Sequence, residues 1–355
     1  MSLLFRYIFL RHARLLLLIM GLGVGIYLLT DIVERVDIFI EAGSGIGLVL
    51  QYFGVRLPSI IAQILPAVFL LATVVTLCLM GGSRELTALH AGGISFATVA
   101  VILVMCGVFW GVVQFCCSQL LAVQGERYSQ QIWQEEVRKK NLDDRTLDDV
   151  WFMESGWTVS VKTLRADGEG SGFSAFHVRD GGSDVDVIVR APRVKGSENG
   201  WVAADAVRLY PDTYQRESLP RLELPLHQDP ELFFSTESNN LQQLPLWQLG
   251  DAINQLGAAG SNVDGLRTVW HGKIAYAVSL VVMAVLGAAI VSRFPNIYIA
   301  VAISMAGTFI MYALTMFGES LGQRGALPPF MAAWGPDTVL LLIAVGRLYL
   351  VSVRR

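Results

Sequence analysis

The chain has 355 residues, of which 53% are hydrophobic and only 16% are charged, and its formal net charge is −3. This composition is far more apolar than that of a soluble protein and predicts a membrane protein, and the lack of excess basic charge argues against nucleic-acid binding. The cysteines all fall within apolar runs, which favours packing roles over disulfides or metal ligation; they are Cys78, Cys106, Cys116 and Cys117.

The first apolar run, over residues 15–29, follows three arginines and so has the outline of a signal peptide. Its apolar pattern continues to residue 40 without a small-x-small cleavage site, and further apolar runs follow it. We therefore predict an uncleaved first membrane span.

Six stretches are apolar enough to cross a bilayer core, which requires about 20 residues in a helix. They cover residues 15–38, 57–80, 96–123, 270–292, 296–317 and 335–353. Because backbone groups in lipid must be paired within their own segment, we expect helices rather than strands.

Arginine placement predicts the orientation of these spans, because short cytoplasmic loops are enriched in Lys and Arg. One side collects most of the arginines, whereas the loops of the other side carry Glu41 with Arg56 and Glu319 with Arg324. We expect both termini to be cytoplasmic and residues 124–266 to be extracytoplasmic. The arginines on the predicted cytoplasmic side are Arg6, Arg11, Arg14, Arg84, Arg293, Arg347, Arg354 and Arg355.

The long interval between the third and fourth spans predicts a small all-β domain. Hydrophobic and polar residues alternate over residues 157–161 and 184–189, as in strands with one buried face. Turn signals at 167–170, 180–182 and 198–200 have the spacing of an antiparallel sandwich or jelly roll. Residues 126–140 extend span three as a polar helix, and residues 245–256 form an amphipathic pattern typical of a short helix.

The outer end of span one carries a charged cluster, formed by Asp31, Glu34, Arg35 and Asp37. Charged residues in or near the bilayer usually face a cavity or a partner. The alternative is a helix end whose side chains simply extend to the interface. Asp31 lies deep enough in the span to favour the cavity.

The loop between spans two and three predicts a short helix. Ser83 suits an N-cap, Glu85 lies in the first turn, where the helix dipole favours a carboxylate, and the pair Gly92 and Gly93 ends the helix. Leu86 and Leu89 would then be available, with Glu85, to enter a groove on a partner. A simple helical connector is the alternative.

The sequence lacks the motifs that are typical of ATP hydrolysis, metal binding and hydrolase catalysis. No GxxxxGK[ST] motif is present, so we do not expect the chain to hydrolyse ATP. None of the five histidines stands at metal-ligand spacing, and no GxSxG element supports a hydrolase. We predict no catalytic residues, no metal and no cofactor in this chain.

The run over residues 84–95 resembles the coupling helix of the LptF/LptG family, the permease subunits of the lipopolysaccharide-export ABC transporter. Further similarity lies at Val36-Asp37 with Ala42-Gly43, at Pro58 with Pro66, at Gln124-Gly125-Glu126 and at Leu327-Pro328-Pro329. It covers essentially the whole chain and is closer to the LptG branch.

The resemblance implies an α-helical protein of the bacterial inner membrane with six transmembrane helices, three plus three, and an inserted periplasmic β-jelly-roll domain. The implied parts are residues 1–124 with the coupling helix at about 83–93, residues 125–266, and residues 267–355. The implied partners are a second permease of the family, a cytoplasmic ATPase dimer that binds ATP and Mg, a bitopic periplasmic bridge protein and lipopolysaccharide. The implied ATPase-coupling residues are Arg84, Glu85, Leu86, Leu89, His90 and Gly92.

The implied lipid site departs from the family pattern. This chain has Glu34 where LptG-like proteins tend to carry Lys, and Ser59 at another position that is often basic. A contact with lipid phosphate would then come from Arg35, from Arg56 or from the partner subunit, with Arg127 beyond span three as a further candidate. Asp31, Glu34 and Asp37 complete the candidate set.

Two other function classes remain open at this point. One is a membrane-anchored scaffold whose β domain binds a partner. The other is a lipid-modifying membrane enzyme with the charged cluster of span one as its site. The coupling-like helix favours the permease over both.

Overall fold

A computed structural model describes residues 2–133, 146–154, 156–165, 167–178, 185–197, 200–228, 230, 244–258 and 261–353. The chain divides into two compact units. Residues 1–132 and 267–355 form the helical unit 1, and the inserted residues 133–266 form unit 2.

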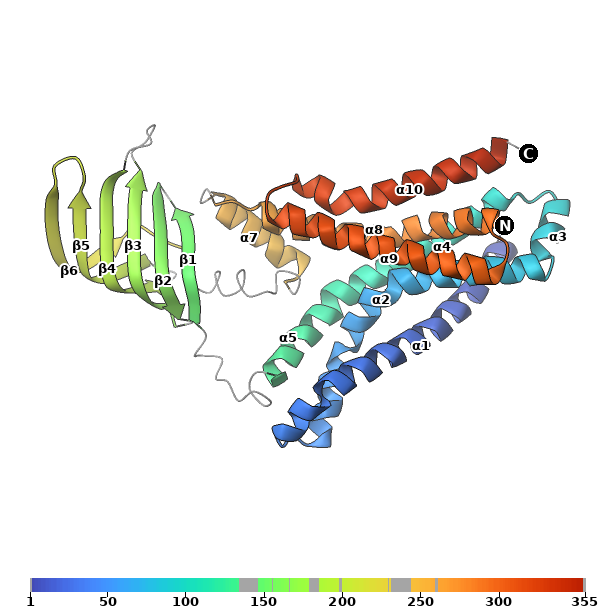
Figure 1. Cartoon of the computed structure of the whole chain (residues 1–355), viewed down its shortest axis with the longest axis horizontal. Helices are drawn as coiled ribbons and strands as arrows, with labels where there is room; N and C mark the ends of the chain where they lie inside the picture. The colour runs from blue at the N-terminus through green and yellow to red at the C-terminus, as the bar shows by residue number, and fades with distance from the viewer. Residues whose placement is uncertain are drawn as a thin grey trace. The chain divides into compact units, whose positions relative to one another are not determined.

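Within the described residues, unit 1 contains six helices that are long and apolar enough to cross a membrane, as predicted (Figure 1). Each helix runs past its predicted apolar stretch, because helical hydrogen bonding continues through polar residues such as Arg11 and Arg56. They are α1 (Ser2–Glu41), α2 (Ile46–Gly82), the continuous segment α4 (Phe96–Cys116), η1 (Cys117–Ala122) and α5 (Val123–Gln131), α8 (Asp264–Arg293), α9 (Ile297–Gln323) and α10 (Pro329–Val353).

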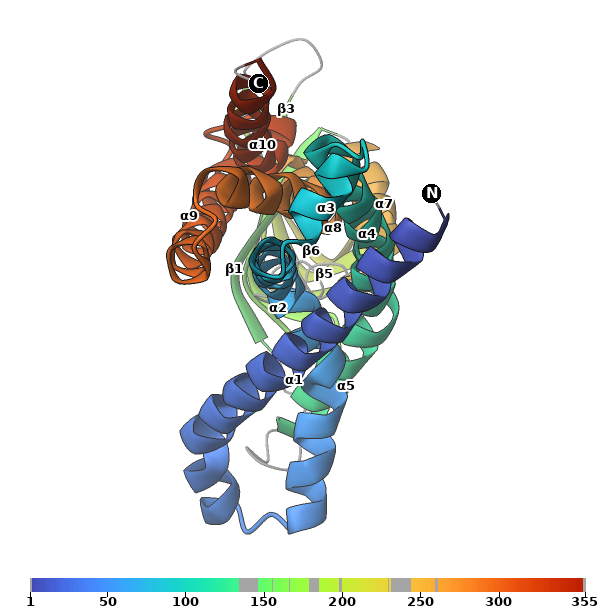
Figure 2. The ribbon, with the colours of Figure 1, turned by 90° about the vertical axis from the view of Figure 1, so that its right-hand side faces the viewer.

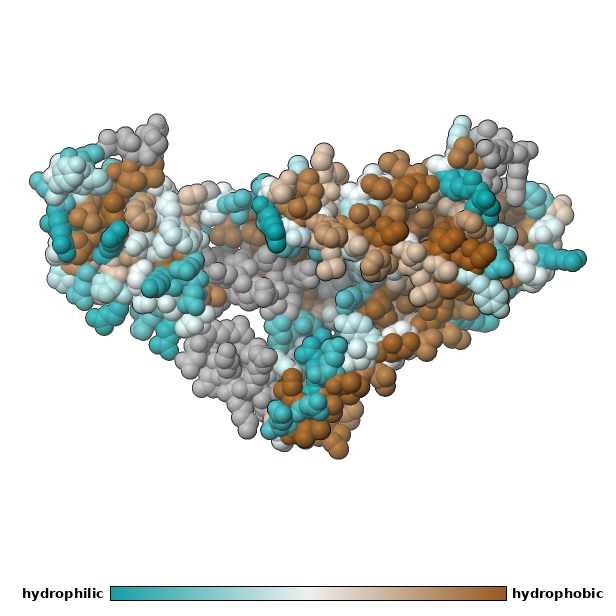
Figure 3. Space-filling model, in the orientation of Figure 1, coloured by the Kyte–Doolittle hydropathy of each residue, from teal (hydrophilic) through white to brown (hydrophobic). Residues whose placement is uncertain are grey.

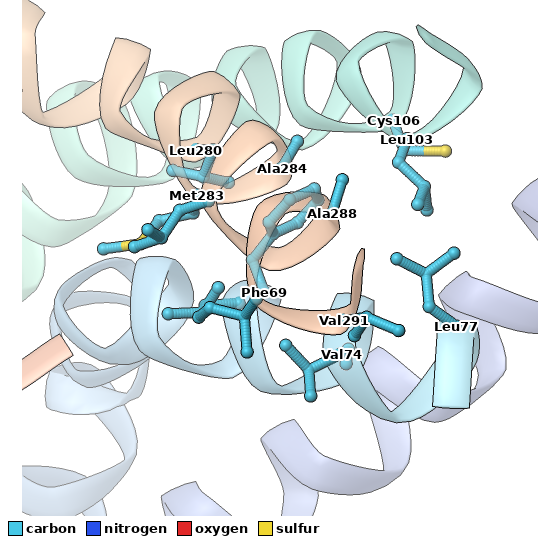
Figure 4. Packing of buried hydrophobic residues seen from close by; sticks show 14 of the residues in the cluster. Phe69, Val74, Leu77, Leu103, Cys106, Leu280, Met283, Ala284, Ala288 and Val291 are labelled. Atoms are coloured by element: carbon cyan, nitrogen blue, oxygen red, sulfur yellow. The ribbon is translucent and has the colours of Figure 1, made fainter. Parts of the chain in front are cut away.

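The core of unit 1 forms where α2, α4 and α8 meet (Figure 4). Phe69 of α2, Leu103 of α4 and Leu280 of α8 are completely buried there. The spans α2 and α8 are the most buried and α1 and α9 the least. Hydrophobic residues accordingly cover much of the visible surface of these helices (Figure 3). Cys78 and Cys106 pack inside, but the prediction of a packing role is wrong for Cys116, which is exposed.

Two glycines of α4 allow it to lie directly against the backbone of α8. A Cβ atom at Gly107 would lie 2.9 Å from the carbonyl oxygen of Leu280, and one at Gly111 would lie 2.7 Å from that of Ala277. The spacing is the small-xxx-small pattern that lets membrane helices approach closely. These two positions therefore fix the packing of α4 on α8.

Pro66 interrupts the hydrogen bonding of α2, because proline has no N–H to donate to the carbonyl of Ala62. Gln114 of α4 donates its side-chain amide to that carbonyl at 3.5 Å. The next carbonyl, that of Gln63, accepts hydrogen bonds from Tyr276 of α8 and, at 2.9 Å, from Tyr312 of α9. Three other helices thus satisfy the backbone of α2 around this proline.

The two tyrosines should act as a redundant pair. In Tyr276→Phe or Tyr312→Phe alone the Gln63 carbonyl keeps one hydroxyl donor, so we expect a small loss of stability. The double variant removes both donors and should cost about 1–3 kcal/mol, more than the sum of the single losses. Thermal unfolding in detergent measures this, with the exposed Tyr298→Phe on α9 as the control. Additive single effects would contradict the arrangement.

The described residues of unit 2 form one six-stranded antiparallel sheet whose strands follow chain order, which confirms the predicted all-β insertion (Figure 1). The strands are β1 (Thr146–Glu154), β2 (Trp157–Arg165), β3 (Glu169–Val178), β4 (Val185–Ser197), β5 (Gly200–Tyr210) and β6 (Gln215–Leu224). Of the predicted turns, the one at Gly168 adopts φ +82° between β2 and β3, while residues 180–182, 198 and 199 lie outside the described residues.

One face of this sheet is apolar and buried. Residues of neighbouring strands face one another in register, for example Val161 with Phe173 and Trp201 with Leu224. The Trp201 indole donates a 2.8 Å hydrogen bond to the carbonyl of Gln228, so the segment after β6 crosses this face.

The predicted helix at 245–256 is also confirmed, as α7 (Leu246–Ala258).

Candidate functional site

A short helix, α3 (Glu85–Ala91), joins α2 to α4 at the same end of unit 1 as the chain's N-terminus (Figure 1 and Figure 2). It begins after Arg84, whose backbone is left-handed with φ 60°, and ends at Gly92 and Gly93, as predicted. Ser83 was expected to cap this helix, but that prediction is wrong. Its one hydroxyl hydrogen is shared between the carbonyl of Leu79 at the end of α2 and the carboxylate of Glu85, both within hydrogen-bond distance.

The carboxylate of Glu85 is the centre of a hydrogen-bond network between α3 and α1. Arg11 places one guanidinium nitrogen 2.8 Å from Oε1 and 2.7 Å from Oε2. Tyr7 donates to Oε2 at 2.9 Å, and Ser83 donates to Oε1 at 2.7 Å. Arg11 also donates to the hydroxyl of Tyr7 at 2.7 Å, which closes the network.

These contacts favour the ionised carboxylate. Partial burial alone would raise the pKa of Glu85, but the hydrogen bonds from Arg11, Ser83 and Tyr7 and the charge of Arg11 outweigh it and lower the pKa below its ordinary value. Glu85 is therefore an anion at neutral pH and is already paired within its own chain.

The remaining predicted coupling residues lie on α3 or directly beside it and differ in burial. Leu86 and Leu89 are half-buried and pack against the core of unit 1, so they hold α3 in place. Arg84, His90 and Gly92 are exposed. The ATPase-coupling role expected of these residues stays a prediction.

A second cluster lies near the other end of α1 and joins it to α2. The Asp31 side chain is only 7% exposed and accepts hydrogen bonds at 2.7 Å from both Arg35 and Arg56. A buried carboxylate is costly unless it is paired and hydrogen-bonded, and here two cations meet that requirement. The charged cluster predicted on span one is thus built around Asp31, and Arg56 of α2 completes it.

Tyr52 supports the two arginines of this cluster. Its ring lies 5.4 Å from the guanidinium carbon of Arg56 and 6.0 Å from that of Arg35, within the range of cation–π attraction. Its hydroxyl accepts a 3.1 Å hydrogen bond from Arg56. The Arg56 side chain is 13% exposed, and within the described part of the chain its buried Nε has no hydrogen-bond partner.

The other predicted lipid-binding residues do not join Asp31. Glu34 and Asp37 lie on exposed positions of α1, and Arg127 is exposed on α5. The structure therefore brings together Asp31, Arg35 and Arg56 and leaves these three residues outside that cluster.

Sequence reasoning missed Tyr7 and Tyr52 and used Arg11 only as an indicator of orientation. One signal could have found them. Tyr7 with Arg11, Asp31 with Arg35, and Tyr52 with Arg56 are each four residues apart, a spacing that places two side chains on one helix face. The partner helix of each pair could not be read from this spacing.

The family model described as "Lipopolysaccharide export system permease LptF/LptG" matches residues 6–350, nearly the full length of the chain. It describes LptF and LptG together, so it does not separate the two branches. No curated protein matches the chain. The match over nearly the whole length shows that the chain belongs to the LptF/LptG family of lipopolysaccharide export permeases.

Proposed function

We propose that this permease is one subunit of an ABC-type exporter, in which a cytoplasmic ATPase dimer docks on α3. The observation that carries the proposal is α3 itself. It is a compact helix between two spans, held from behind by Leu86, Leu89 and Glu85, with Arg84 and His90 exposed in front. A surface fixed in this way can pass a rigid-body movement of the ATPase to the spans.

The arginine distribution supports an orientation with α3 and both termini in the cytoplasm of a bacterial cell and unit 2 in the periplasm. In this orientation the chain binds no ATP or Mg itself, and the partner ATPase supplies hydrolysis. The permease contributes movement rather than catalysis.

A second permease of the same family is the proposed partner within the membrane. The least buried spans are α1 and α9, and both carry runs of exposed apolar side chains that lipid or a subunit would cover. On α1 these include Leu18, Leu22 and Leu29, and on α9 they include Phe309, Met316 and Phe317. A cavity between two such subunits would take lipopolysaccharide from the outer leaflet of the inner membrane.

The arginines beside Asp31 are the proposed contacts for lipid phosphate. Arg35 and Arg56 both donate to Asp31, so a phosphate would share or displace an existing anion. Asp31 would then tune the site, because it offsets one of the two positive charges. Glu34, Asp37 and Arg127 are exposed and would contribute at its edge.

The sheet of unit 2 is the proposed route for the acyl chains toward a bitopic bridge protein. Moving each CH₂ group into water costs about 0.8 kcal/mol, so several acyl chains cannot cross the periplasm unprotected. The apolar face that carries Phe173 and Trp201 would shelter them. Because Trp201 is completely buried, this face must open before a chain can enter.

The test is co-purification of the membrane complex with its ATPase, together with ATP-dependent release of lipopolysaccharide from proteoliposomes. We expect Glu85→Arg to remove the Arg11 contact and place two cations together, so that the ATPase is lost and release stops. Glu41→Arg is the matched control, because Glu41 is exposed at the end of α1 away from α3. If the wild type purifies without an ATPase and Glu85→Arg still supports export, the proposal fails.

A further inference from the structure

The link between α3 and α1 gives a specific role to Arg11. We propose that Arg11 is a positioning residue that anchors Glu85, and through it α3, to α1. The inference rests on the proposed ATPase partnership and adds to it the path by which movement enters the spans.

The geometry singles out Arg11 among the groups around Glu85. Ser83 is two residues from Glu85, so its hydrogen bond holds the local turn but joins no second helix. Arg11 is 74 residues away, carries the opposite charge and reaches both carboxylate oxygens. Tyr7 adds a neutral hydrogen bond from the same face of α1. The charge-assisted bonds of Arg11 are the strongest of these contacts.

The pair is also partly protected from water. The Arg11 side chain is 25% exposed and that of Glu85 is 31% exposed, and the Tyr7 hydroxyl covers one oxygen of the carboxylate. Fully exposed ion pairs contribute little, but a half-buried pair in a network is screened less. The contact is therefore suited to hold α3 while an ATPase pushes on its outer face.

The anchor makes α1 part of the coupling path. Arg11 and Asp31 lie on the same unbroken helix, 20 residues or about 30 Å apart. A displacement of α3 that is passed to Arg11 thus moves the helix that carries Asp31 and Arg35. The covalent connections of α3 lead only to α2 and α4, so without Arg11 the movement would reach α1 only through packing and the neutral hydrogen bond from Tyr7.

The experiment is a double-mutant cycle with Arg11→Met, Glu85→Ala and the double variant, using the assembled permease complex. We expect each single change to weaken ATPase affinity by about tenfold and the double variant to be no weaker than the worse single variant, because each residue acts through the other. Independent roles would multiply to about a hundredfold. Arg14→Met is the matched control, since Arg14 is exposed on the same helix.

A second measurement does not need the ATPase. Hydrogen exchange of the amides of α3 in the isolated chain should be faster in Arg11→Met and in Glu85→Ala than in the wild type, and unchanged in Arg14→Met. Multiplying effects in the cycle, or wild-type exchange in Arg11→Met, would overturn the anchor. If Glu85→Ala speeds exchange but no variant alters ATPase affinity, the proposed docking on α3 is wrong, and with it the coupling role of Arg11.

Discussion

Gly111→Val is expected to prevent α4 from packing on α8 and to remove most of the folded protein. The Cβ position at Gly111 lies 2.7 Å from a backbone oxygen of α8, and a backbone cannot move aside as a flexible side chain can. Overpacking of a tight core costs about 1–3 kcal/mol, and a clash between two helix backbones belongs at or above the upper end of that range. Gly107→Val should act in the same direction, because its Cβ would also meet the backbone of α8.

The measurement is the yield of monodisperse protein in detergent and its unfolding temperature. Gly346→Val is the matched control, because a Cβ atom there has nothing within 4 Å and the residue also lies inside a membrane-spanning helix. We expect the control to unfold like the wild type. If Gly111→Val and Gly346→Val behave alike, α4 does not depend on this close approach.

The spans were predictable because their signal is local. A run of apolar residues determines that a segment can cross a bilayer, and all six such segments are helices of sufficient length. The contacts between helices, in contrast, join residues that are far apart in the sequence. The approach at Gly107 and Gly111 depends on the backbone of α8, some 170 residues further along the chain. Hydropathy carries no information about that pairing.

In the sheet, too, the local pattern was predictable and the long-range contacts were not. Alternation over residues 157–161 follows from one buried face, and Val159 and Val161 are indeed completely buried. The consecutive strand order and the placement of Trp201 beneath the segment after β6 arise from pairing and from a hydrogen bond to Gln228. These contacts depend on residues that periodicity does not connect.

The candidate site was predictable in some of its residues but not in their partners. The sequence placed Glu85 in the first turn of a short helix, and this is confirmed. The sequence did not predict that Arg11 would contact Glu85, because an arginine near the start of α1 is equally well explained by a cytoplasmic N-terminus. Likewise Arg56 was counted as a loop charge, whereas α2 begins at Ile46 and places it within a helix beside Asp31.

Removal of Asp31 is the second change with a large expected effect. In Asp31→Ala the two arginines lose their shared anion in a mostly buried position, and breaking such a pair from one side costs about 3–5 kcal/mol. Arg56→Met should cost somewhat less, because Asp31 keeps Arg35. Arg35→Met should cost least, since Arg35 is the more exposed arginine and Asp31 keeps Arg56.

The stability of the double variant Asp31→Ala with Arg56→Met distinguishes the contribution of the ion pair from that of side-chain packing. It removes one positive and one negative group together, so it should be more stable than Asp31→Ala alone even though it carries one more substitution. Unfolding in detergent gives the order, with Asp37→Ala as the control for an exposed carboxylate of the same helix. If the double variant is less stable than Asp31→Ala by the full cost of Arg56→Met, the two side chains contribute independently, and the link between α1 and α2 rests on the aromatic packing of Phe39 against Tyr52 instead.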